Sequence, residues 1–592
     1  MGNEAIAMGA LAAGVNVVCG YPGTPSSEVV ETVAKRKPDG VYVEWSINEK
    51  TAMEVAAGAA YSGSRVLVTM KQMGLNVCSD PLMCVNYIGI KGGLVVLSAD
   101  DPGPISSQTE QDSRHFGKYA GIPVFDPATP EEAYRMVQDA FELSEKLGTP
   151  VILRPTTRVC HNCASIEIEE VKSPEKPEGF IKDSRWVIFP RLAYSAKCRL
   201  FEREEGLSDL LSQYCFNTTA GKGKLGVACG GVSAAYTKDV LAELGADCRL
   251  LNVATPYPFP SKLAEAFLDG LDSVIVFEEL DPVIEDALTE ICGRKGLRVK
   301  ICGKRTGHTI HAGENTHFII KKQLSAFLGI ELKEEIPDFS DAPELPARPP
   351  ILCAGCPHRA AFYAVKQAMK GKKAVFCGDI GCYTLGNAMP LDMVDTCLCM
   401  GASVSVPQGM YHSENDAVHF GFIGDSTFFH SGITNVINAV YNKAEEIVVI
   451  LDNSTTAMTG HQPHPGIGKT MMGDISEKIS IEKILEAVGV TSVRVADPLK
   501  LEEAVDAVRE AASEKGVRCI IFRSPCVALF KPDKKMAVQP EKCRKCQRCI
   551  RELGCPALSI EDGRAVVEPS LCNGCGLCAE VCGFGAIEEV RG

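Results

Sequence analysis

Apolar segments alternate with helical stretches along the first 165 residues. Short apolar runs that predict strands lie at residues 15–19, 65–70, 94–98 and 151–154, and stretches suited to helices separate them. This alternation is typical of a parallel sheet with helices on its faces. We therefore predict an α/β domain over residues 1–165, followed by an irregular connecting segment over residues 166–222.

The same pattern returns twice farther along the chain. Predicted strands at residues 224–228, 273–277 and 298–301 indicate an α/β domain over 223–330, and strands at 417–423, 447–451 and 518–522 indicate another over 351–535. The segment between them, 331–350, is rich in proline and acidic residues and cannot sustain a helix or a central strand. We interpret it as a linker, and residues 536–592 as a separate cysteine-rich tail.

Size and charge narrow the class of protein. A chain of 592 residues exceeds what one hydrophobic core supports, and 45% hydrophobic with 23% charged residues is ordinary for folded globular material. The net charge of -14 argues against a nucleic-acid partner. The chain shows no apolar run of membrane-spanning length and no signal-peptide pattern, so we expect a cytoplasmic protein without a membrane partner.

Cysteine is abundant, with 27 residues of which eight lie between Cys543 and Cys582. Cytosolic thiols stay reduced, so metal binding is a better explanation than disulfides. Two groups show three cysteines at two-residue spacing and a remote fourth: Cys543, Cys546, Cys549 and Cys555, then Cys572, Cys575, Cys578 and Cys582. In bacterial ferredoxins each triplet shares a cluster with the other group's remote cysteine.

The tail is therefore predicted to hold two [4Fe-4S] clusters. Cys582 would complete the first triplet and Cys555 the second. The first group has five residues before its fourth cysteine where the usual pattern has three. A pair of four-cysteine zinc sites is the alternative, although such sites usually show cysteine pairs and not triplets.

A second candidate site lies in the third α/β domain. Asp425 follows a predicted strand and the turn at Gly424, and Asn453 follows the next strand, twenty-eight residues later. One strand-helix-strand crossover separates them, so the two side chains can converge at the carboxyl edge of the sheet. A carboxylate, an amide oxygen and a main-chain carbonyl suit Mg²⁺, which in turn binds a diphosphate.

This spacing resembles the thiamine diphosphate motif, a Gly-Asp followed by an Asn some thirty residues on. The resemblance implies that Asp425, Asn453 and the main-chain oxygen of Thr455 bind the metal, with the phosphates near Gly424, Ser426 and Thr427. Taken alone, Gly-Asp after a strand is more often an ordinary turn.

Thiamine chemistry also needs a carboxylate against the aminopyrimidine, to favour the form that removes the C2 proton. Glu49 is the candidate, because it precedes an alanine-rich helix at the end of a predicted strand over residues 41–43. A glutamate there is more often only favourable with the helix dipole. Glu44 and Glu54 remain alternatives.

Several segments together resemble the 2-oxoacid:ferredoxin oxidoreductases. They are Tyr-Pro-Gly-Thr-Pro-Ser-Ser at 21–27, Asn48-Glu49, Cys-Ala-Gly-Cys-Pro-His-Arg at 353–359, and Gly424-Asp425 with Asn453. Their order, ending in the cysteine-rich tail, is similar to the alpha subunits that act on indolepyruvate, over essentially the whole chain. The resemblance implies a multidomain α/β fold: a pyrimidine-binding domain first, a transketolase C-terminal-like domain next, a diphosphate-binding domain third and a ferredoxin-like α+β module last.

The implied activity is oxidative decarboxylation of indolepyruvate and other aryl pyruvates to the acyl-CoA and carbon dioxide, with electrons passed to ferredoxin. Glu49 would be catalytic, and Thr24 and Arg114 would face the substrate, although Arg114 could instead be a solvated helix-surface residue. A smaller beta subunit and a heterotetramer of two pairs are expected. Another 2-oxoacid substrate, a non-oxidative decarboxylase and a scaffold subunit that only transfers electrons remain alternatives.

A third cluster near the thiamine is also predicted. Cys353 and Cys356 form a Cys-x2-Cys pair, and Cys382 and Cys526 follow as distant single cysteines, an order similar to that of related oxidoreductases. The alternative is that these are buried structural cysteines. Cys377, Cys397 and Cys399 lie nearby and leave the choice of ligands open, whereas Cys160 and Cys163 are interpreted as ordinary cysteines.

Overall fold

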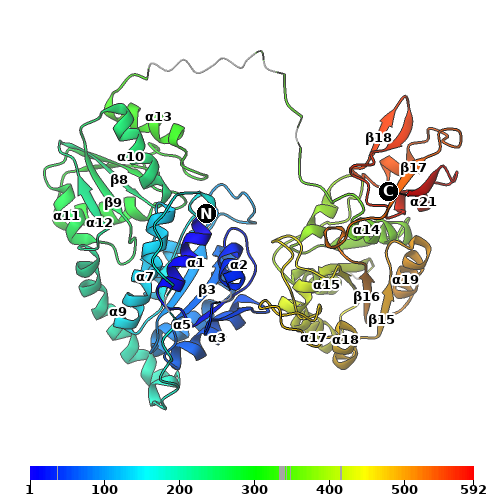
Figure 1. The fold of residues 1–592 in the computed structure, drawn as a ribbon, viewed down its shortest axis with the longest axis horizontal. Helices are drawn as coiled ribbons and strands as arrows, with labels where there is room; N and C mark the ends of the chain where they lie inside the picture. Colours follow the sequence, from blue (N-terminus) through cyan, green and yellow to red (C-terminus); the bar gives the residue numbers. More distant parts are fainter. Residues whose placement is uncertain are drawn as a thin grey trace. The chain divides into compact units, whose positions relative to one another are not determined.

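The computed structural model describes residues 1–36, 38–171, 173–332, 341, 343–346, 348–413 and 416–591. The chain folds as two compact units, Met1–Ser340 and Asp341–Gly592, coloured blue to green and green to red in Figure 1. Residues 333–340, 342 and 347 of the predicted linker lie outside the described part of the chain.

The first unit begins with a six-stranded parallel sheet, in the order β2-β1-β3-β4-β6-β5. Its strands are short and rich in valine, leucine and isoleucine, and the central ones are buried along their length, as expected when helices cover both faces. The strands are β1 (Val17–Gly20), β2 (Tyr42–Trp45), β3 (Val66–Lys71), β4 (Leu94–Ala99), β5 (Val124–Phe125) and β6 (Val151–Leu153).

Helices cover both faces of this sheet (Figure 1). On one side α1, α2 and α7 pack together, and on the other α3 and α5 share a core with β3 and β4. Thr129 caps α7 by accepting from the Glu132 amide at 3.2 Å, and Gly148 ends it in the left-handed conformation. The helices are α1 (Gly2–Ala12), α2 (Ser27–Arg36), α3 (Glu49–Tyr61), α4 (Gln72–Val77), α5 (Ser79–Ile88), α6 (Ser113–Ala120), α7 (Pro130–Leu147) and α8 (Thr157–His161).

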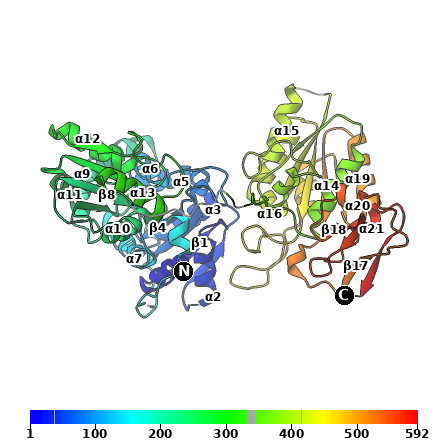
Figure 2. The same cartoon turned by 90° about the horizontal axis from the view of Figure 1, so that it is seen from above.

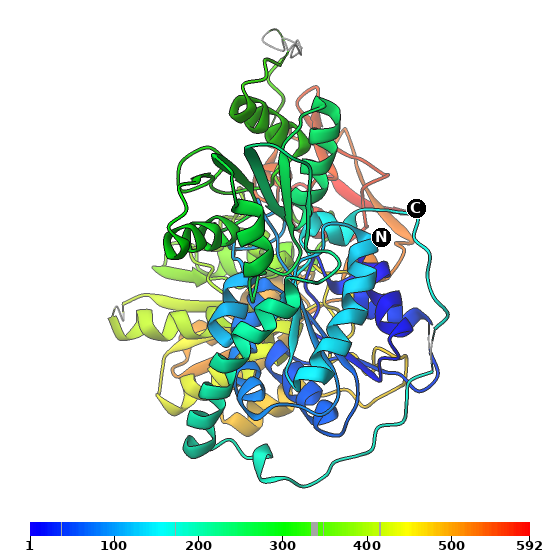
Figure 3. The same ribbon diagram turned by 90° about the vertical axis from the view of Figure 1, so that its left-hand side faces the viewer.

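A second sheet of five strands follows in the same unit and is drawn in green in Figure 3. Its strand order is β11-β10-β8-β9-β7, with only β7 antiparallel to its neighbour. Helices α10 and α13 cover one face, and α11 and α12 cover the other. The elements are β7 (Thr218–Ala220), β8 (Leu225–Gly230), β9 (Arg249–Val253), β10 (Ser273–Phe277), β11 (Lys300–Cys302), α10 (Val232–Leu244), α11 (Ser261–Leu268), α12 (Val283–Lys295) and α13 (His317–Leu328).

The connecting segment over residues 166–222 is not irregular throughout, which corrects the prediction. It contains a short 3₁₀ turn, η1 (Ser184–Trp186), and a helix of 22 residues, α9 (Pro190–Leu211). Pro190 starts the helix at a position where its missing amide costs nothing. The helix buries only Ala196, Leu207 and Leu211. Because Tyr194, Phe201 and Leu210 are exposed, its sequence lacks the clean amphipathic period that would have revealed it.

The second unit contains a five-stranded parallel sheet in the order β12-β13-β14-β16-β15. Helices α14 and α19 cover one face, and α15, α17 and α18 lie on the other. The elements are β12 (Ala374–Cys377), β13 (Val418–Gly424), β14 (Glu446–Asp452), β15 (Ser492–Ala496), β16 (Val517–Arg523), α14 (Pro357–Ala368), η2 (Cys382–Asn387), α15 (Ala402–Ser413), α16 (Asp425–Thr427), η3 (Phe428–Gly432), α17 (Ile433–Tyr441), α18 (Ile481–Val488), α19 (Leu501–Ser513) and η4 (Val527–Leu529).

The cysteine-rich tail is built from two antiparallel strand pairs and two short helices (Figure 2). Its elements are β17 (Lys534–Val538), α20 (Arg548–Arg551), β18 (Leu558–Glu561), β19 (Arg564–Val567), α21 (Leu577–Val581) and β20 (Ile587–Arg591). Leu553 and Leu577 of the tail belong to the same hydrophobic core as Phe362 of α14 and Phe422 of β13. The tail is therefore packed onto the third sheet domain, and the predicted fold class is confirmed.

Among the described residues, no helix is both long enough and apolar enough to cross a bilayer.

Candidate functional site

Two neighbouring strand ends bring Asp425 and Asn453 to one edge of the third sheet. Strands β13 and β14 pair in parallel, with Gly424 opposite Leu451, so the residues that follow them leave the sheet side by side. Asp425 is buried and accepts hydrogen bonds from the amides of Ser426 and Ser454, each at 2.8 Å. The Asp425 and Asn453 turns are thus joined directly.

The other residues predicted to bind the metal or the phosphates lie around the same turn. The amide of Thr455 lies 3.2 Å from Oδ1 of Asn453. The Thr427 hydroxyl lies 3.1 Å from that of Tyr383. A Cβ on Gly424 would come within 2.6 Å of the Tyr383 ring, so the turn requires a glycine. Ser426 is buried beside Asp425, and its hydroxyl bonds to Thr456 at 2.9 Å. The donor set of carboxylate, amide oxygen and hydroxyl groups fits Mg²⁺ and a diphosphate.

Two histidines that the sequence analysis did not single out belong to this edge. Nε2 of His464 lies 3.1 Å from Oδ2 of Asp425, and Nε2 of His358 lies 3.4 Å from Nδ2 of Asn453. Burial lowers the pKa of His358 to about 4, against the opposing charge of Asp425, so this imidazole is neutral at pH 7. His358 lies within the Cys-Ala-Gly-Cys-Pro-His-Arg segment at 353–359, but that segment gave it no role of its own. His464 shares no recognisable spacing with the aspartate.

Asp379 is a further missed residue and organises the loop before this edge. It is fully buried, and its carboxylate accepts from the amides of Gly401 at 2.9 Å and Ser403 at 3.0 Å. It lies just beyond the end of β12, the strand beside β13. The turn that follows Asp379 leads to Tyr383, so the carboxylate fixes the segment that packs on Gly424.

In the first unit, Glu49 is the buried carboxylate of the three candidates. It is the first residue of α3, whose start is capped by Asn48 accepting from the Thr51 amide at 2.8 Å. Its Cγ would lie 2.8 Å from a Cβ on Gly74, so α4 leaves just enough room for it. Glu54 is exposed and pairs with Lys50, and the half-buried Glu44 accepts from Tyr42 and Ser46. Burial therefore favours Glu49 over its two alternatives.

Thr24 lies in the turn after β1, at the same carboxyl edge of the first sheet as Glu49. A residue that sequence reasoning missed, Lys71, ends β3 beside this turn, since a Cβ on Gly23 would lie 3.1 Å from its Cγ. Burial lowers the pKa of Lys71, and the charges of Asp101 and Glu49 partly oppose that shift. A partly buried cation thus lies close to both the turn and the glutamate.

Arg114 does not face an open site, which corrects its predicted role in binding the substrate. Its side chain is 1% exposed and forms a bidentate pair with Asp112, with the shortest contact at 2.6 Å. It also pairs with Glu278 at 2.8 Å and donates to the carbonyl oxygens of Glu279 and Asp281. These partners lie after β10, so the guanidinium joins the first sheet domain to the second. The alternative of a solvated surface arginine is equally wrong.

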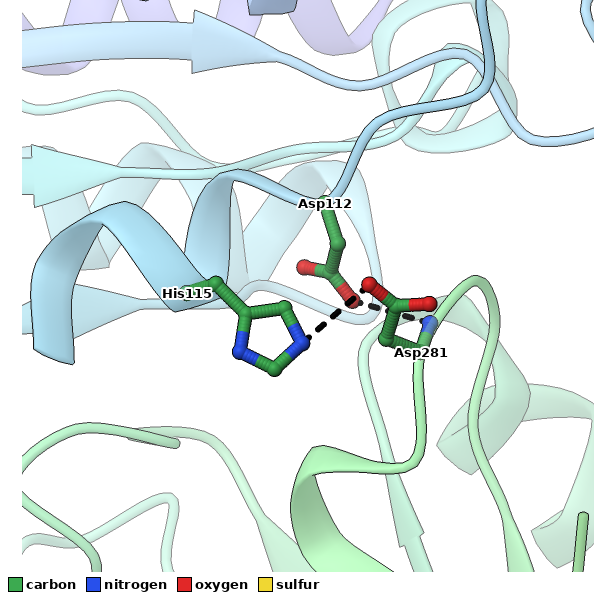
Figure 4. Close-up of side chains that lie close together, drawn as sticks. All are labelled: Asp112, His115 and Asp281. Atoms are coloured by element: carbon green, nitrogen blue, oxygen red, sulfur yellow. Dashed lines mark hydrogen bonds and ion pairs between the residues drawn. The ribbon is translucent and has the colours of Figure 1, made fainter. Parts of the chain in front are cut away.

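Arg154 extends this buried network, pairing with Asp100 at 2.7 Å and Asp126 at 3.2 Å. Figure 4 shows its rim, where the exposed His115 lies 3.1 Å from Asp281 and the Asp281 amide donates to Asp112. Asp112, His115 and Asp281 are close enough to share a cation. Both oxygens of Asp112 already accept from Arg114, so the trio is part of the domain interface and does not suggest a metal site.

Each of the two cysteine sets paired from their spacing surrounds its own cavity in the tail. One cavity is lined by Cys543, Cys546, Cys549 and Cys582, and the other by Cys555, Cys572, Cys575 and Cys578. Burial, with a smaller contribution from neighbouring thiols, raises the pKa of Cys549 to about 11 and that of Cys578 to about 12. Two sets of four convergent thiols fit two [4Fe-4S] clusters.

Three of the four cysteines proposed for a third cluster lie near one another, and one of them, Cys526, contacts Asn453. Burial raises the pKa of Cys382 to about 11, with added contributions from the thiols of Cys526 and Cys353, so these three lie within electrostatic reach. The Cys526 amide donates to the Asn453 carbonyl oxygen at 3.0 Å. Cys356 is buried in the same loop as Cys353 and lines the second tail cavity.

The other cysteines nearby are placed differently. The Cys377 thiol contacts the Met410 sulfur at 3.7 Å, while Cys397 and Cys399 are exposed. In the first unit Cys160 is buried and Cys163 is exposed.

Comparison with known proteins agrees with this geometry. Residues 8–184 match the family model for the pyruvate flavodoxin/ferredoxin oxidoreductase thiamine diphosphate-binding domain, and residues 379–522 match that for the C-terminal TPP-binding domain of thiamine pyrophosphate enzymes. Residues 565–588 match a 4Fe-4S binding domain.

Curated relatives extend the likeness to the whole chain. Subunit IorA of indolepyruvate oxidoreductase from Methanothermobacter thermautotrophicus is 41% identical, with 99% of this chain and 96% of the relative covered. The subunit from Thermococcus kodakarensis is 40% identical, with 94% and 91% covered. The chain belongs to the indolepyruvate oxidoreductase IorA family. The predicted family and its class, the 2-oxoacid:ferredoxin oxidoreductases, are thereby confirmed.

The matched domains identify two kinds of cofactor. The matched domains bind thiamine diphosphate and 4Fe-4S clusters. The Asp425 edge lies within the matched C-terminal thiamine domain, and Glu49 and Thr24 lie within the matched first domain. The second tail triplet lies within the matched 4Fe-4S domain.

Proposed function

We propose that this chain catalyses the oxidative decarboxylation of indolepyruvate and other aryl pyruvates to the acyl-CoA and carbon dioxide, and passes the electrons through iron-sulfur clusters to ferredoxin. The proposal depends on one observation: Asp425 and Asn453 meet at the carboxyl edge of the third sheet, and Cys526 contacts Asn453 there. The two cysteine-lined cavities of the tail lie in the same unit. A non-oxidative decarboxylase has no use for these thiols.

The proposed cofactor site uses the oxygen donors already described. Asp425, Asn453 and the main-chain oxygen of Thr455 would hold Mg²⁺, and the Gly424, Ser426 and Thr427 turn would receive the diphosphate. When bound, thiamine diphosphate supplies a carbon nucleophile for the ketone and an electron sink for the decarboxylation. His464, beside Asp425, would hold the metal-binding carboxylate in its orientation.

Glu49 is proposed to hold a proton at N1′ of the aminopyrimidine. Its burial strengthens the contact, because a carboxylate shielded from water interacts more strongly with a partner than an exposed one. With Arg114 assigned to the domain interface, Lys71 is the cation proposed to attract the substrate carboxylate, together with the hydroxyl of Thr24. Lys71 is suited to this role because it ends β3 beside the Gly23 turn, at the edge of the first sheet that carries Thr24 and Glu49.

Three clusters are proposed for the electron path. Two are the tail clusters, and the third would be held by Cys353, Cys356, Cys382 and Cys526 near Asn453. Iron analysis of the anaerobically purified chain tests this count, with about twelve irons expected for three cubanes. About eight irons, unchanged in a Cys353→Ser Cys356→Ser variant, would leave only the tail pair.

A smaller beta subunit is the proposed partner, because the curated relatives are named as subunits. The assembly would be a heterotetramer of two such pairs. Full activity from this chain purified alone would contradict the need for the partner.

A panel of 2-oxoacids, assayed with ferredoxin and coenzyme A, tests the substrate. Aryl pyruvates should give the highest kcat/KM, and a clear preference for pyruvate would overturn the substrate assignment. Analysis of thiamine diphosphate and magnesium per chain gives a second test. Absence of both would contradict the enzyme function altogether.

A further inference from the structure

Arg359 is a buried arginine that no step of the proposed reaction uses. It lies in the first turn of α14, three residues after Cys356, and its side chain is 4% exposed overall. A buried guanidinium normally has a carboxylate partner, because an unpaired charge is costly to remove from water. Within the described part of the chain, no carboxylate lies in ion-pair range of Arg359.

The donors of Arg359 instead join two cysteine loops. One terminal nitrogen donates to the carbonyl oxygens of Leu553 at 2.6 Å and Gly554 at 3.0 Å, immediately before Cys555. The other donates to the carbonyl oxygen of Leu352 at 2.6 Å, immediately before Cys353. One planar group therefore holds the Cys-x2-Cys loop against the turn that carries the fourth cysteine of a tail set.

A second contact fixes the same two segments. The Asn573 amide donates to the Ala354 carbonyl oxygen at 2.7 Å, and a Cβ on Gly355 would come within 2.8 Å of Asn573. The Cys-x2-Cys loop therefore packs directly on the loop that begins with Cys572. This contact is neutral, which makes it a useful comparison for the charged one.

The guanidinium also faces the thiols themselves. Arg359 lines the cavity that Cys555, Cys572, Cys575 and Cys578 surround. Its Nε is buried and finds no hydrogen-bond partner among the residues that the structure describes. Burial lowers its pKa, while the thiols of Cys555 and Cys356 are foremost in opposing that shift. Cysteine thiols thus take the place, beside this positive charge, of the carboxylate that would normally pair with it.

A cluster held by four thiolates is an anion, and reduction adds one more negative charge. A fixed positive charge beside it stabilises the reduced form more than the oxidised form, and net charge and hydrogen bonds to sulfur are among the factors that set cluster potentials. We propose that Arg359 is a positioning residue of the electron path. It raises the reduction potential of the cluster held by Cys555, Cys572, Cys575 and Cys578. It also fixes the neighbouring Cys-x2-Cys loop against that cluster.

This inference rests on the proposed clusters, and the two can fail separately. Iron content of the wild-type complex tests the clusters, and comparison among Arg359 variants tests the arginine. The assay is a potentiometric titration of the anaerobic complex, followed by electron paramagnetic resonance, so its readout is independent of turnover. Arg359→Gln removes the charge, Arg359→Lys keeps it, and Asn573→Ala removes the neutral contact between the same loops. Arg509→Gln is the control, because Arg509 is exposed on α19.

The Gln variant should keep its iron and lower the reduction equilibrium constant of one cluster by at least about tenfold, which is 59 mV for a one-electron couple. The Lys variant should shift less, and the Asn573 and Arg509 variants should stay within about twofold of wild type, less than 20 mV on the same scale. An unchanged potential in an iron-replete Gln variant overturns the proposal, as does an equal shift in the Asn573→Ala variant.

If the Gln variant loses the iron of one cluster, the Lys variant decides the question. Retention of that iron with lysine supports the requirement for a positive charge. Loss of the same iron from the Lys variant overturns the charge role, because the charge would then be present without its effect.

Discussion

Replacing Arg114 with methionine should destabilise the first unit without impairing substrate binding. The substitution leaves Asp112 and Glu278 buried without their counter-charge, since both side chains are at most 1% exposed in the ion pairs they make. Breaking a buried pair by removing one partner costs about 3 to 5 kcal/mol. With about 2.1 cal/mol/K of unfolding entropy per residue, a unit of some 340 residues should lose roughly 4 to 7 °C in Tm.

The assay compares calorimetric melting with steady-state kinetics at 25 °C in the Arg114→Met complex. We expect the lower Tm together with a KM within about twofold of wild type. A twofold change in KM corresponds to less than about 0.5 kcal/mol of apparent substrate-binding free energy. Arg158→Met is the matched control, because Arg158 bridges to Glu314 in an exposed pair and should cost at most about 1 kcal/mol. Glu278→Gln in the Arg114→Met background should restore part of the stability. A Tm equal to wild type with a tenfold higher KM would refute the structural role.

Three further changes test other parts of the account. Burial raises the pKa of Glu446 to about 8, so the folded state keeps a proton that the unfolded chain releases above its pKa near 4.5. The free energy of unfolding should therefore fall by up to about 1.4 kcal/mol per pH unit as the pH rises between these two values. Glu446→Gln should flatten the profile of Tm against pH from pH 5 to 8; a profile as steep as that of wild type, or equal flattening by Glu445→Gln, would refute this. Lys71→Met should raise KM at least about tenfold, or 1.4 kcal/mol of transition-state binding, and an unchanged KM would remove Lys71 from the substrate site. Asp425→Ala should abolish retention of magnesium and thiamine diphosphate on gel filtration while leaving the iron content unchanged, and full retention would move the metal site elsewhere.

The thiamine edge was largely predictable from the sequence because its determinants are local. Asp425 and Asn453 each end a strand, and adjacent parallel strands must deliver them to one edge, as β13 and β14 do. The cysteine spacing, interpreted with the bacterial ferredoxin pattern, also paired the eight tail cysteines that line two cavities. Sequence patterns predict a site reliably when one strand-helix-strand crossover or one loop brings its residues together.

Residues whose environment depends on distant segments were not predictable. The Arg114 environment is set by Glu278, 164 positions along the chain at the end of another domain's strand, so no local pattern distinguishes a buried arginine from an exposed one. Lys71 resembles an ordinary strand-end lysine until the Gly23 turn is placed over it. Helix α9 was missed because its exposed apolar residues hide the helical period.

The central claim is that electrons leave the 2-oxoacid through this chain's own clusters. Its most direct test mixes the anaerobic oxidised complex with indolepyruvate, in the absence of ferredoxin, and records iron-sulfur absorbance and electron paramagnetic resonance spectra in a single turnover. We predict rapid bleaching and the spectra of reduced [4Fe-4S] clusters, and a rate about 100 to 10,000 times slower in the Glu49→Gln variant with its thiamine diphosphate retained. Carbon dioxide release with fully oxidised clusters would contradict the account.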